Sequence, residues 1–253
     1  MIDVKDLFAG YGKEPVLQGV NMSAKAGEIT TILGANGSGK STLLKAVGGM
    51  IPTQRGEILI AGDPALSMSR IQRARLMAYL PQSKHTPDIT VGRLVLHGRF
   101  PHLSYPRIYS EKDIQIAKSV MQAMEIAQWE DTPLSELSGG MRQRVYLAMV
   151  LAQQSEIILM DEPTTYLDLG QQIKFLQLLK ELAQQGKTLL LVLHDILLAL
   201  KLSDRICVMD HGKIVAAGSP QEILDCRILT ELYGVRIGEI ETEKSTQFYY
   251  CVE

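Results

Sequence analysis

The chain has 253 residues, 46% of them hydrophobic and 21% charged, which is enough to bury a substantial core in one α/β domain or in two closely joined lobes. Its 26 lysine and arginine residues face 28 acidic residues, and the formal net charge of −2 provides no basic excess for binding nucleic acid. No stretch approaches the roughly 20 apolar residues of a membrane-spanning helix, and Met1–Lys5 lacks the pattern of a signal peptide, so we expect a cytoplasmic protein.

The three cysteines do not indicate a disulfide framework or a zinc site. Cys207, Cys226 and Cys251 are odd in number, lie far apart in the sequence and have no pair of histidines nearby. This pattern favours reduced thiols that serve as packing residues.

The first 80 residues predict short strands separated by glycines. Apolar and β-branched residues gather in five runs, with turn-forming glycines between several of them. The runs cover residues 2–8, 16–24, 29–33, 56–62 and 76–80. A helix is expected over 42–47, after the third run, and we interpret this half as a nucleotide-binding sheet.

From about residue 83 the apolar residues recur at helical spacing. Val91, Leu94 and Val95 share one predicted helix face. A second helix has its predicted apolar face at Ile114, Ala117, Val120, Met121 and Met124. Pro101 and Pro106 interrupt the pattern between these helices, and another helix is predicted from about Gly139 to Gln153. Residues 85–153 are therefore expected to form a mostly helical insertion.

The rest of the chain alternates strands with helices. The apolar run 157–160 is typical of a strand buried on both faces of a parallel sheet, a helix is predicted over 171–184, and 188–193 repeats the buried-strand pattern. This order favours a parallel core. A hairpin over 205–217, short helices, and late strands over 235–240 and 247–252 complete the prediction. We expect a single domain, 1–253, whose core comprises residues 1–84 and 154–253.

Residues 34–41, Gly-Ala-Asn-Gly-Ser-Gly-Lys-Ser, form a phosphate-binding loop between a predicted strand and a predicted helix. The glycines let the backbone curl so that several N–H groups point at phosphate oxygens, and the helix adds its positive N-terminal end. Lys40 brings a mobile positive charge to the β- and γ-phosphates, and the Ser41 hydroxyl is placed to ligate Mg²⁺. The loop predicts binding of a nucleoside triphosphate.

Asp161 and Glu162 directly follow the buried strand 157–160. A carboxylate at the end of a strand beside a phosphate loop can hold the hydration shell of Mg²⁺, and a second carboxylate can polarise an attacking water. We therefore expect Asp161 to serve the metal and Glu162 to serve the water. An ordinary acidic turn after a strand is the simpler alternative.

Two further polar side chains follow predicted strands. The Gln82 amide oxygen could reach the metal or the water, and His194 could hydrogen-bond the γ-phosphate. Either residue alone would more often be an ordinary surface or core group. Their positions become meaningful only together with a third motif.

The third motif is Leu137-Ser138-Gly139-Gly140-Met141, a Ser-Gly-Gly step that opens a helix on the helical insertion. Its exposed N–H groups, helix N-terminus and serine hydroxyl suit a γ-phosphate. If the insertion is a separate lobe, the economical geometry is a two-fold dimer in which the Ser138 site of each copy covers the nucleotide held by the other. Helix capping by Ser138 is the simpler alternative.

In the order and spacing of these motifs, the chain resembles the ATP-binding subunit of an ABC transporter over essentially its whole length. Tyr11 matches the aromatic residue that stacks on adenine, and residues 34–41 match the Walker A loop. The other matches are Gln82 (Q-loop), residues 137–141 (signature), Asp161 and Glu162 (Walker B), Leu167-Asp168 (D-loop) and His194 (switch histidine). The resemblance implies an α/β fold: a P-loop NTPase (RecA-like) core with a parallel sheet, an N-terminal antiparallel β-subdomain and an inserted α-helical subdomain.

The resemblance also implies an ATPase with ATP and Mg²⁺ as cofactors. The catalytic residues would be Glu162, His194, Gln82 and Lys40, and the metal residues Ser41, Gln82 and Asp161. The nucleotide-binding residues would be Tyr11, Gly34, Asn36, Gly37, Ser38, Gly39, Lys40, Ser41, Thr42, Ser138, Gly139 and Gly140.

A narrower resemblance, through Gly98-Arg99-Phe100-Pro101-His102 and residues 161–168, is to subunits that serve iron–siderophore, haem and vitamin B12 importers. It implies a homodimer that docks on two integral-membrane permease subunits at the inner face of the cell membrane and works indirectly with an extracytoplasmic solute-binding protein. The permease is expected to contact residues 83–106, with His85, Phe100, His102 and Tyr105 as candidates. An importer of molybdate or another metal chelate, and a soluble ABC-type ATPase of cluster assembly, stay open as alternatives.

The signature departs from the family pattern at one position. The family usually has Gln or Glu as the fifth signature residue, whereas this chain has Met141, which carries no charge and accepts hydrogen bonds poorly. The contacts attributed to Ser138 and to the glycine N–H groups do not depend on that side chain. We expect an intact site with an altered rate or coupling.

Overall fold

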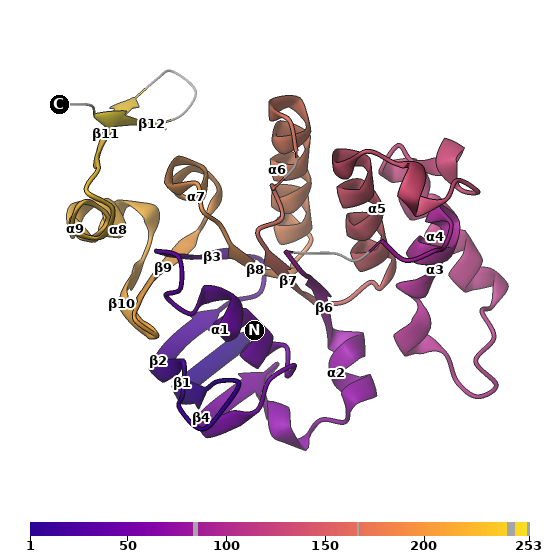
Figure 1. Ribbon diagram of the computed structural model, residues 1–253, viewed down its shortest axis with the longest axis horizontal. Coiled ribbons are helices and arrows are strands. Elements are labelled where there is room, and N and C mark those ends of the chain that lie inside the picture. The colour runs from indigo at the N-terminus through magenta and orange to yellow at the C-terminus, as the bar shows by residue number, and fades with distance from the viewer. Residues whose placement is uncertain (83–85, 166, 242–245, 252–253) are drawn as a thin grey trace.

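A central sheet of six strands organises the chain. A computed structural model describes residues 1–82, 86–165, 167–241 and 246–251 (Figure 1). The strand order is β10-β9-β3-β8-β7-β6, with β10 antiparallel and the other neighbours parallel. The strands are β3 (Ile29–Gly34), β6 (Met77–Leu80), β7 (Ile157–Asp161), β8 (Thr188–Val192), β9 (Arg205–Asp210) and β10 (Lys213–Gly218). Every residue of β3, β7 and β8 is buried, which explains their continuous apolar character.

A second, antiparallel sheet has the order β2-β1-β4-β5. Its strands are β1 (Ile2–Ala9), β2 (Leu17–Ala24), β4 (Thr53–Ile60) and β5 (Asp63–Pro64). The interpretation of the first 80 residues as one nucleotide-binding sheet is therefore wrong, because only β3 and β6 join the central sheet. Alternating burial along β1 and β2 suits a sheet with one covered face. The antiparallel sheet that the family resemblance implied is confirmed.

Helices cover both faces of the central sheet (Figure 1). Helix α1 (Lys40–Val47) and the antiparallel sheet lie on one side, while α6 (Leu169–Gln184) and α7 (Ile196–Leu202) lie on the other. Alternate residues of β8 pack into two hydrophobic cores, one on each side of the sheet. Leu190 packs on the side of α1 and the antiparallel sheet, and Leu191 packs on the side of α6 and α7. The chain ends with α8 (Pro220–Asp225), α9 (Ile228–Tyr233) and the hairpin β11 (Arg236–Glu241) and β12 (Thr246–Cys251).

Helices dominate the segment between β6 and β7. They are α3 (Val91–His97), α4 (Glu111–Ala123) and α5 (Gly139–Ala152), with short 3₁₀ turns at η2 (Phe100–His102), η3 (Ala127–Trp129) and η4 (Leu134–Glu136). Val91, Leu94 and Val95 are buried, as the helical spacing predicted. These helices gather beyond β6 (Figure 1). The proposed subdomain limits at residues 85 and 153 stay predictions.

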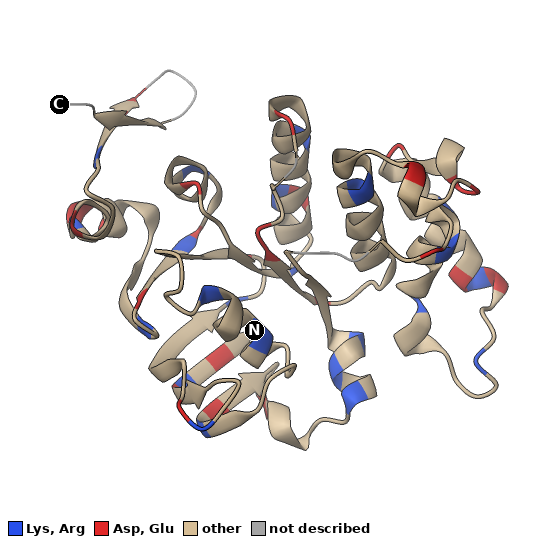
Figure 2. Cartoon of the chain, in the orientation of Figure 1, with Lys and Arg blue, Asp and Glu red and all other residues tan. Residues whose placement is uncertain are grey.

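Helix α7 was not predicted from the sequence, and neither was α2 (Arg70–Leu76), which follows the 3₁₀ turn η1 (Ala65–Ser67). Its sequence, RIQRARL, has no buried residue, so it shows no clear apolar face. Ser69 and Gln72 begin the helix with a reciprocal capping box. Figure 2 marks the basic residues of α2 in blue along its ribbon.

The packing role expected of the cysteines is confirmed for Cys207 and is wrong for Cys226 and Cys251. Cys207 is buried in β9, but Cys226 and Cys251 are exposed, and all three are free thiols. The latter two lie at the ends of α8 and β12, outside the core. Within the described residues, no helix combines the length and the apolar character needed to cross a membrane.

Candidate active site

The phosphate-binding loop joins the end of β3 to the start of α1. Gly37 and Gly39 have φ angles of +81° and +103°, which glycine adopts readily and other residues adopt only with strain. A Cβ atom on Gly34 would lie 2.4 Å from the Met209 carbonyl oxygen. The glycines therefore fit both the curl of the loop and its close approach to β9.

The hairpin turn between β9 and β10 supports this loop. The Gly212 N–H donates to the Ser38 carbonyl oxygen at 3.0 Å, and the Gln18 N–H donates to the Gly212 carbonyl oxygen at 2.8 Å. Gly212 has φ +77°, and a Cβ there would lie 2.0 Å from the Val16 carbonyl oxygen. The sequence predicted the hairpin but not its role as a support for the loop.

Lys40 and Ser38 carry the polar side chains at the base of the loop. Lys40 is only 6% exposed, and its Nζ donates to the carbonyl oxygens of Gly34 and Ala35 at 2.8 and 2.9 Å. Burial lowers the pKa of Lys40, against the opposing effect of Glu162 and Asp161. The buried Ser38 Oγ has no hydrogen-bond partner among the described residues. A phosphate oxygen would satisfy that hydroxyl, so the loop fits a nucleoside triphosphate.

Asp161 ends β7 and faces Ser41. The Ser41 hydroxyl donates to Asp161 Oδ1 at 2.9 Å, and Asp161 is 2% exposed. Burial raises the pKa of Asp161, while the hydrogen bond from Ser41 lowers it. A hydroxyl and a carboxylate at this distance are oxygen ligands of the kind that Mg²⁺ prefers beside a phosphate. The pair therefore fits the metal role predicted for it.

Tyr79 is a further partner of Asp161 that was not predicted from the sequence. Its hydroxyl lies 3.4 Å from Asp161 Oδ2, so the two carboxylate oxygens face different hydroxyl groups. Strand β6 lies beside β7, with Tyr79 opposite Leu159. Burial, followed by the nearby Asp161 carboxylate, raises the pKa of Tyr79, which keeps its hydroxyl protonated.

Glu162 and His194 meet at the ends of the neighbouring strands β7 and β8. His194 Nε2 lies 2.5 Å from Glu162 Oε1. Glu162 has the left-handed φ of +49°, and its N–H donates to the Val192 carbonyl oxygen at 3.1 Å. The His194 side chain is 46% exposed and that of Glu162 is 11% exposed, so the histidine lies on the solvent side of the pair. The geometry joins two residues that the sequence separates by 32 positions.

Four other predicted site residues, Tyr11, Asn36, Thr42 and Gln82, differ in exposure and in their contacts. Tyr11 is 63% exposed, and Lys45 of α1 lies 3.4 Å from its hydroxyl and 5.7 Å from its ring centroid. Asn36 is exposed on the loop, and Thr42 is buried in α1. Gln82 is exposed just after β6, and among the described residues its side chain forms no hydrogen bond with Asp161 or Ser41. The roles assigned to these residues stay predictions.

The Ser138 motif lies apart from the loop of the same copy. Ser138 Oγ accepts a hydrogen bond from the Met141 N–H at 3.3 Å and caps α5, as its simpler alternative predicted. The strand β3, which leads into the loop, is separated from β6 by β8 and β7, a span of about 14 Å. Helix α5 lies beyond β6 (Figure 1).

The Gln143 side chain links α5 to the segment that follows Glu162. The buried Gln143 donates through Nε2 to the Pro163 carbonyl oxygen at 2.6 Å. Pro163 directly follows Glu162. Met141 packs its half-buried side chain against the hydrophobic core, so its side chain fills a packing position.

The chain is similar to known proteins over nearly its whole length. The sequence profile of the family described as "ABC transporter" matches residues 17–165. The iron(3+)-hydroxamate import ATP-binding protein FhuC of Bacillus subtilis (strain 168) is 37% identical over 253 residues, covering 99% of this chain and 94% of that relative. The ferric enterobactin transport ATP-binding protein FepC of Escherichia coli (strain K12) is 39% identical over 234 residues, covering 92% of this chain and 86% of that relative.

A solved structure extends the similarity to three dimensions. A metal-chelate type ABC transporter in an inward-facing conformation matches with a TM-score of 0.84 and 27% sequence identity. The match covers 100% of this chain and 98% of that one. All the motif segments described above therefore lie within the matched fold.

Proposed function

This chain belongs to the ABC transporter family of ATP-binding proteins, and from that premise we propose that it is the ATP-hydrolysing subunit of an importer for an iron chelate. The observation that carries the proposal is the convergence of loop, metal and base candidates at the ends of adjoining strands. Ser41 lies 2.9 Å from Asp161, and Glu162 lies 2.5 Å from His194. Residues that hold Mg²⁺ and a residue that acts as base or positions the attacking water are recurring parts of phosphoryl transfer to water.

In the proposed reaction, the loop N–H groups and Lys40 bind the triphosphate. Ser41 and Asp161 would hold Mg²⁺, which would neutralise part of the phosphate charge. Glu162 accepts a proton from the attacking water as the water oxygen forms a bond to the γ-phosphorus. The bond between the γ-phosphorus and its bridging oxygen breaks, which gives ADP and inorganic phosphate. His194 orients the Glu162 carboxylate and hydrogen-bonds the γ-phosphate.

Two copies are proposed to act together. The Ser138 site lies beyond β6 and away from the loop of its own copy, which supports a dimer in which each Ser138 site closes over the other copy's nucleotide. The attraction through the triphosphate exists only in the closed pair, so ATP favours closure and hydrolysis favours opening.

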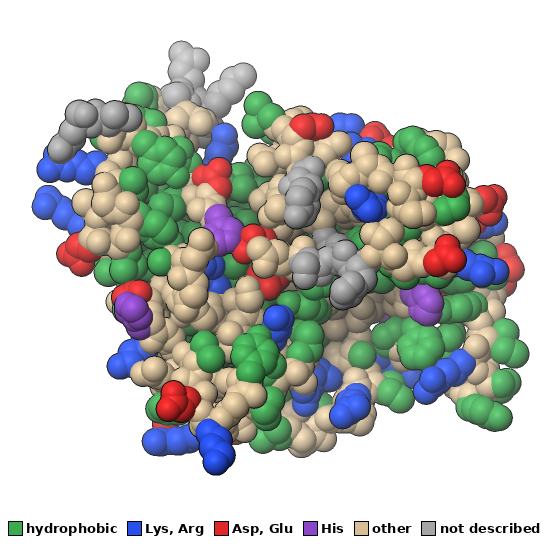
Figure 3. All heavy atoms as spheres, in the orientation of Figure 1, with side chains coloured by type: hydrophobic (Ala, Val, Ile, Leu, Met, Phe, Trp, Pro, Cys, Tyr) green, Lys and Arg blue, Asp and Glu red, His purple; other side chains and the backbone are tan. Residues whose placement is uncertain are grey.

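The proposed membrane partner is a permease of two integral-membrane subunits. We define the docking turn as residues 99–108, which follow α3. Phe100, Tyr105 and Ile108 are 43%, 95% and 73% exposed. Figure 3 shows hydrophobic side chains gathered with basic ones near the end of α3. Apolar side chains at this density on a surface favour a protein partner.

Two of the predicted permease contacts need comment. His85 lies outside the described residues. His102 is half-buried, and its Nε2 lies 2.8 Å from the Gln153 carbonyl oxygen, so its ring is engaged inside the chain. Phe100 and Tyr105 are the better candidates. Docking there would hold the chain at the inner face of the cell membrane, with an extracytoplasmic binding protein delivering the solute.

Transport in proteoliposomes tests the proposal. The chain would be isolated through an affinity tag from detergent-solubilised membranes of its own cells, together with the membrane subunits bound to it. We expect ATP-dependent uptake of a ferric hydroxamate or ferric catecholate, and loss of uptake in Glu162→Gln. Uptake of haem, a corrinoid or molybdate instead would contradict the iron-siderophore assignment. Recovery of the chain only in the membrane-free fraction, bound to a cluster-assembly scaffold, would contradict the importer itself.

A further inference from the structure

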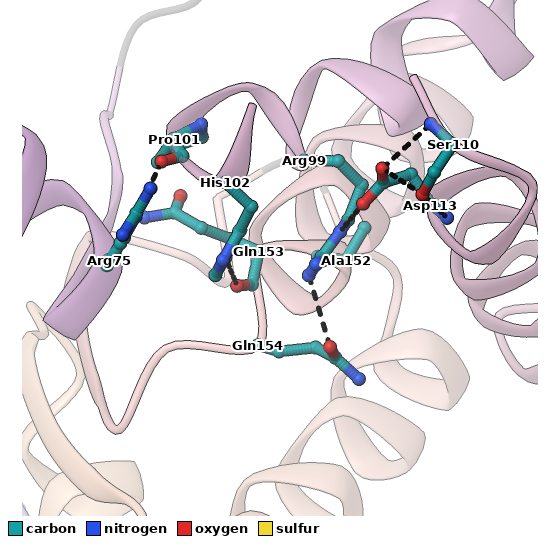
Figure 4. Close-up of polar contacts among 9 residues, drawn as sticks. All are labelled: Arg75, Arg99, Pro101, His102, Ser110, Asp113, Ala152, Gln153 and Gln154. Carbon is teal, nitrogen blue, oxygen red and sulfur yellow. Dashed lines mark hydrogen bonds and ion pairs between the residues drawn. The ribbon is translucent and has the colours of Figure 1, made fainter. Parts of the chain in front are cut away.

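A buried arginine ties the docking turn to two helices. Arg99, the first residue of the turn, is 6% exposed, and its Nε donates to Asp113 Oδ1 of α4 at 2.9 Å (Figure 4). Its Nη1 donates to the Ala152 carbonyl oxygen at 2.9 Å and to Gln154 Oε1 at 3.1 Å. One guanidinium therefore joins the end of α3, the first turn of α4 and the end of α5.

A second set of bonds joins the same turn to the edge of the central sheet. The Gln153 backbone carbonyl meets His102, and its side-chain Nε2 donates to the carbonyl oxygens of Ala74 and, at 3.0 Å, Met77. Arg75 Nε of α2 donates to the Pro101 carbonyl oxygen at 2.9 Å. Gln153 thus lies between the docking turn and the α2–β6 connection (Figure 4).

The packing leaves little room for the turn to slide on α5. A Cβ atom on Gly98 would lie 2.1 Å from the Met149 carbonyl oxygen and 3.1 Å from the Ala152 side chain. Ser110 and Asp113 cap the start of α4 reciprocally, and the same Asp113 carboxylate pairs with Arg99. The backbone before the turn and the helix after it are therefore both held against α5.

Arginine suits this position for a reason of geometry. Its planar guanidinium presents five donors in a fixed arrangement, so it can bond a carboxylate and a carbonyl in different directions at once. A lysine has one compact ammonium on a flexible stem and cannot reproduce that arrangement. A buried ion pair is also weak evidence for stability alone, which leaves room for a positioning role.

We infer that Arg99, Asp113, His102, Gln153 and Arg75, named here the Arg99 joint, pass displacement between the docking turn and α5. The inference rests on the proposed function, because it assumes that a permease meets the turn and that a second copy's ATP meets the Ser138 site. Helix α5 runs from Gly139 to Ala152, a length of about 20 Å, so the joint holds one end of the helix and Ser138 caps the other. Arg99 and Gln153 are positioning residues, which act through α5.

Hydrogen exchange with and without MgATP tests the inference in the full-length chain. The parent is Glu162→Gln, in which hydrolysis is blocked, and the readout is amide exchange in the docking turn. In the parent, we expect MgATP to change exchange in this turn by at least about threefold, although the turn lies at the far end of α5 from Ser138. Arg99→Lys and Gln153→Ala, each added to the parent, should lose most of this response.

The matched control is Arg107→Ala in the same turn. Arg107 lies 4.9 Å from the Phe100 ring centroid and is not part of the joint. The Arg107→Ala substitution removes a positive charge from the same turn but leaves the joint intact. The response of this variant to MgATP should therefore equal that of the parent. Thermal unfolding identifies any variant that has lost its fold. If Arg99→Lys does not fold, Gln153→Ala decides the test, because Gln153 is only half-buried.

The outcomes separate the inference from the function on which it rests. A parent that forms an ATP-dependent dimer but shows no response in the turn contradicts the inference alone. The inference is also contradicted if Arg99→Lys and Gln153→Ala, each added to the parent, respond to MgATP as the parent does. A parent that neither binds ATP nor dimerises contradicts the proposed function, and the inference with it.

Discussion

Glu162 is the residue on which the proposed chemistry depends most directly. The residue directly follows β7, which ends at Asp161, and its Oε1 lies 2.5 Å from His194 Nε2. We predict that Glu162→Gln binds ATP but hydrolyses it at least about 100-fold more slowly, because the amide cannot accept the proton of the water. Lys40→Ala should instead bind ATP poorly. Equilibrium ATP binding and steady-state hydrolysis check both variants, and near-normal turnover by Glu162→Gln would remove the proposed base.

Tyr79 gives a finer prediction at the same scale. Its hydroxyl faces Asp161 Oδ2 at 3.4 Å, while Ser41 occupies Oδ1. Tyr79→Phe keeps the ring and removes the donor, so Asp161 would lose one restraint worth about 1 kcal/mol. We expect the Mg²⁺ concentration for half-maximal hydrolysis to rise about fivefold, with a smaller change in kcat.

The control for Tyr79 is another tyrosine without a place in the site. Tyr105 is 95% exposed, so Tyr105→Phe should leave the Mg²⁺ dependence of the isolated chain unchanged. The measurement is the hydrolysis rate against Mg²⁺ at fixed ATP. Identical curves for Tyr79→Phe and the unmodified chain would show that the tyrosine only packs.

At the scale of the element, the start of helix α4 depends on Asp113. Hydrogen bonding by Ser110, and further by Arg99, lowers the pKa of Asp113 to about 2 against the opposing effect of burial. A carboxyl with a lowered folded-state pKa contributes stability that is fully present above its unfolded pKa near 4. That contribution is lost as the pH falls from about 4 to about 2.

We therefore predict that Asp113→Asn lowers the free energy of unfolding by about 3 kcal/mol at pH 7, since Arg99 loses its buried partner. The difference in free energy of unfolding between the variant and the unmodified chain should shrink by about 2 kcal/mol as the pH falls from 4 to 2. Urea unfolding at several pH values measures both. Asp131→Asn, at an exposed position, is the control, and a gap that stays constant with pH would contradict the assignment.

Elements with a strong local pattern could be predicted from the sequence. The apolar runs of β7 and β8, the apolar face of α3 and the start of α5 at Gly139 all agree with the structure. The pairing of strands could not be predicted, because half-buried strands and central strands both appear as short apolar runs between glycines. Helix α2 was missed because its seven residues bury none of their side chains.

The same division holds for the candidate site. The phosphate loop, Asp161, Glu162 and His194 could be identified because each follows a buried strand or carries a motif with its own chemistry. Tyr79 and Gln143 could not, because their importance comes from contacts across 82 and 20 positions of the chain. Gly212 is similar, since only the folded hairpin brings it against Ser38.

At the scale of the whole molecule, the fold separates two candidate anion-binding sites that the proposed mechanism needs together. The phosphate loop follows β3, while the Ser138 site opens α5 beyond β6. If each closed site takes its loop from one copy and its Ser138 site from the other, two different inactive variants can complement one another. Sites built within one copy cannot do so.

Lys40→Ala and Ser138→Arg form the pair for this test. Each variant alone should hydrolyse ATP at background rates, since its homodimers contain no complete site. In a mixed dimer, the intact loop of the Ser138→Arg copy meets the intact Ser138 site of the Lys40→Ala copy. An equimolar mixture should therefore recover up to about a quarter of the unmodified activity, because half of the dimers are mixed and each has one complete site.

The control mixture combines Lys40→Ala with Glu162→Gln. Both substitutions affect the half of the site that contains the loop, so the mixed dimer has no complete site and should recover nothing. Ser138 is exposed and caps α5, so Ser138→Arg should cost about 1 kcal/mol of stability without unfolding the chain, which thermal unfolding verifies. Recovery of activity in both mixtures would contradict the shared site, because the mixed dimer of the control contains no complete site. Recovery in neither, with ATP-dependent dimers still forming in Glu162→Gln, would mean that the Ser138 site does not complete the partner's catalytic centre.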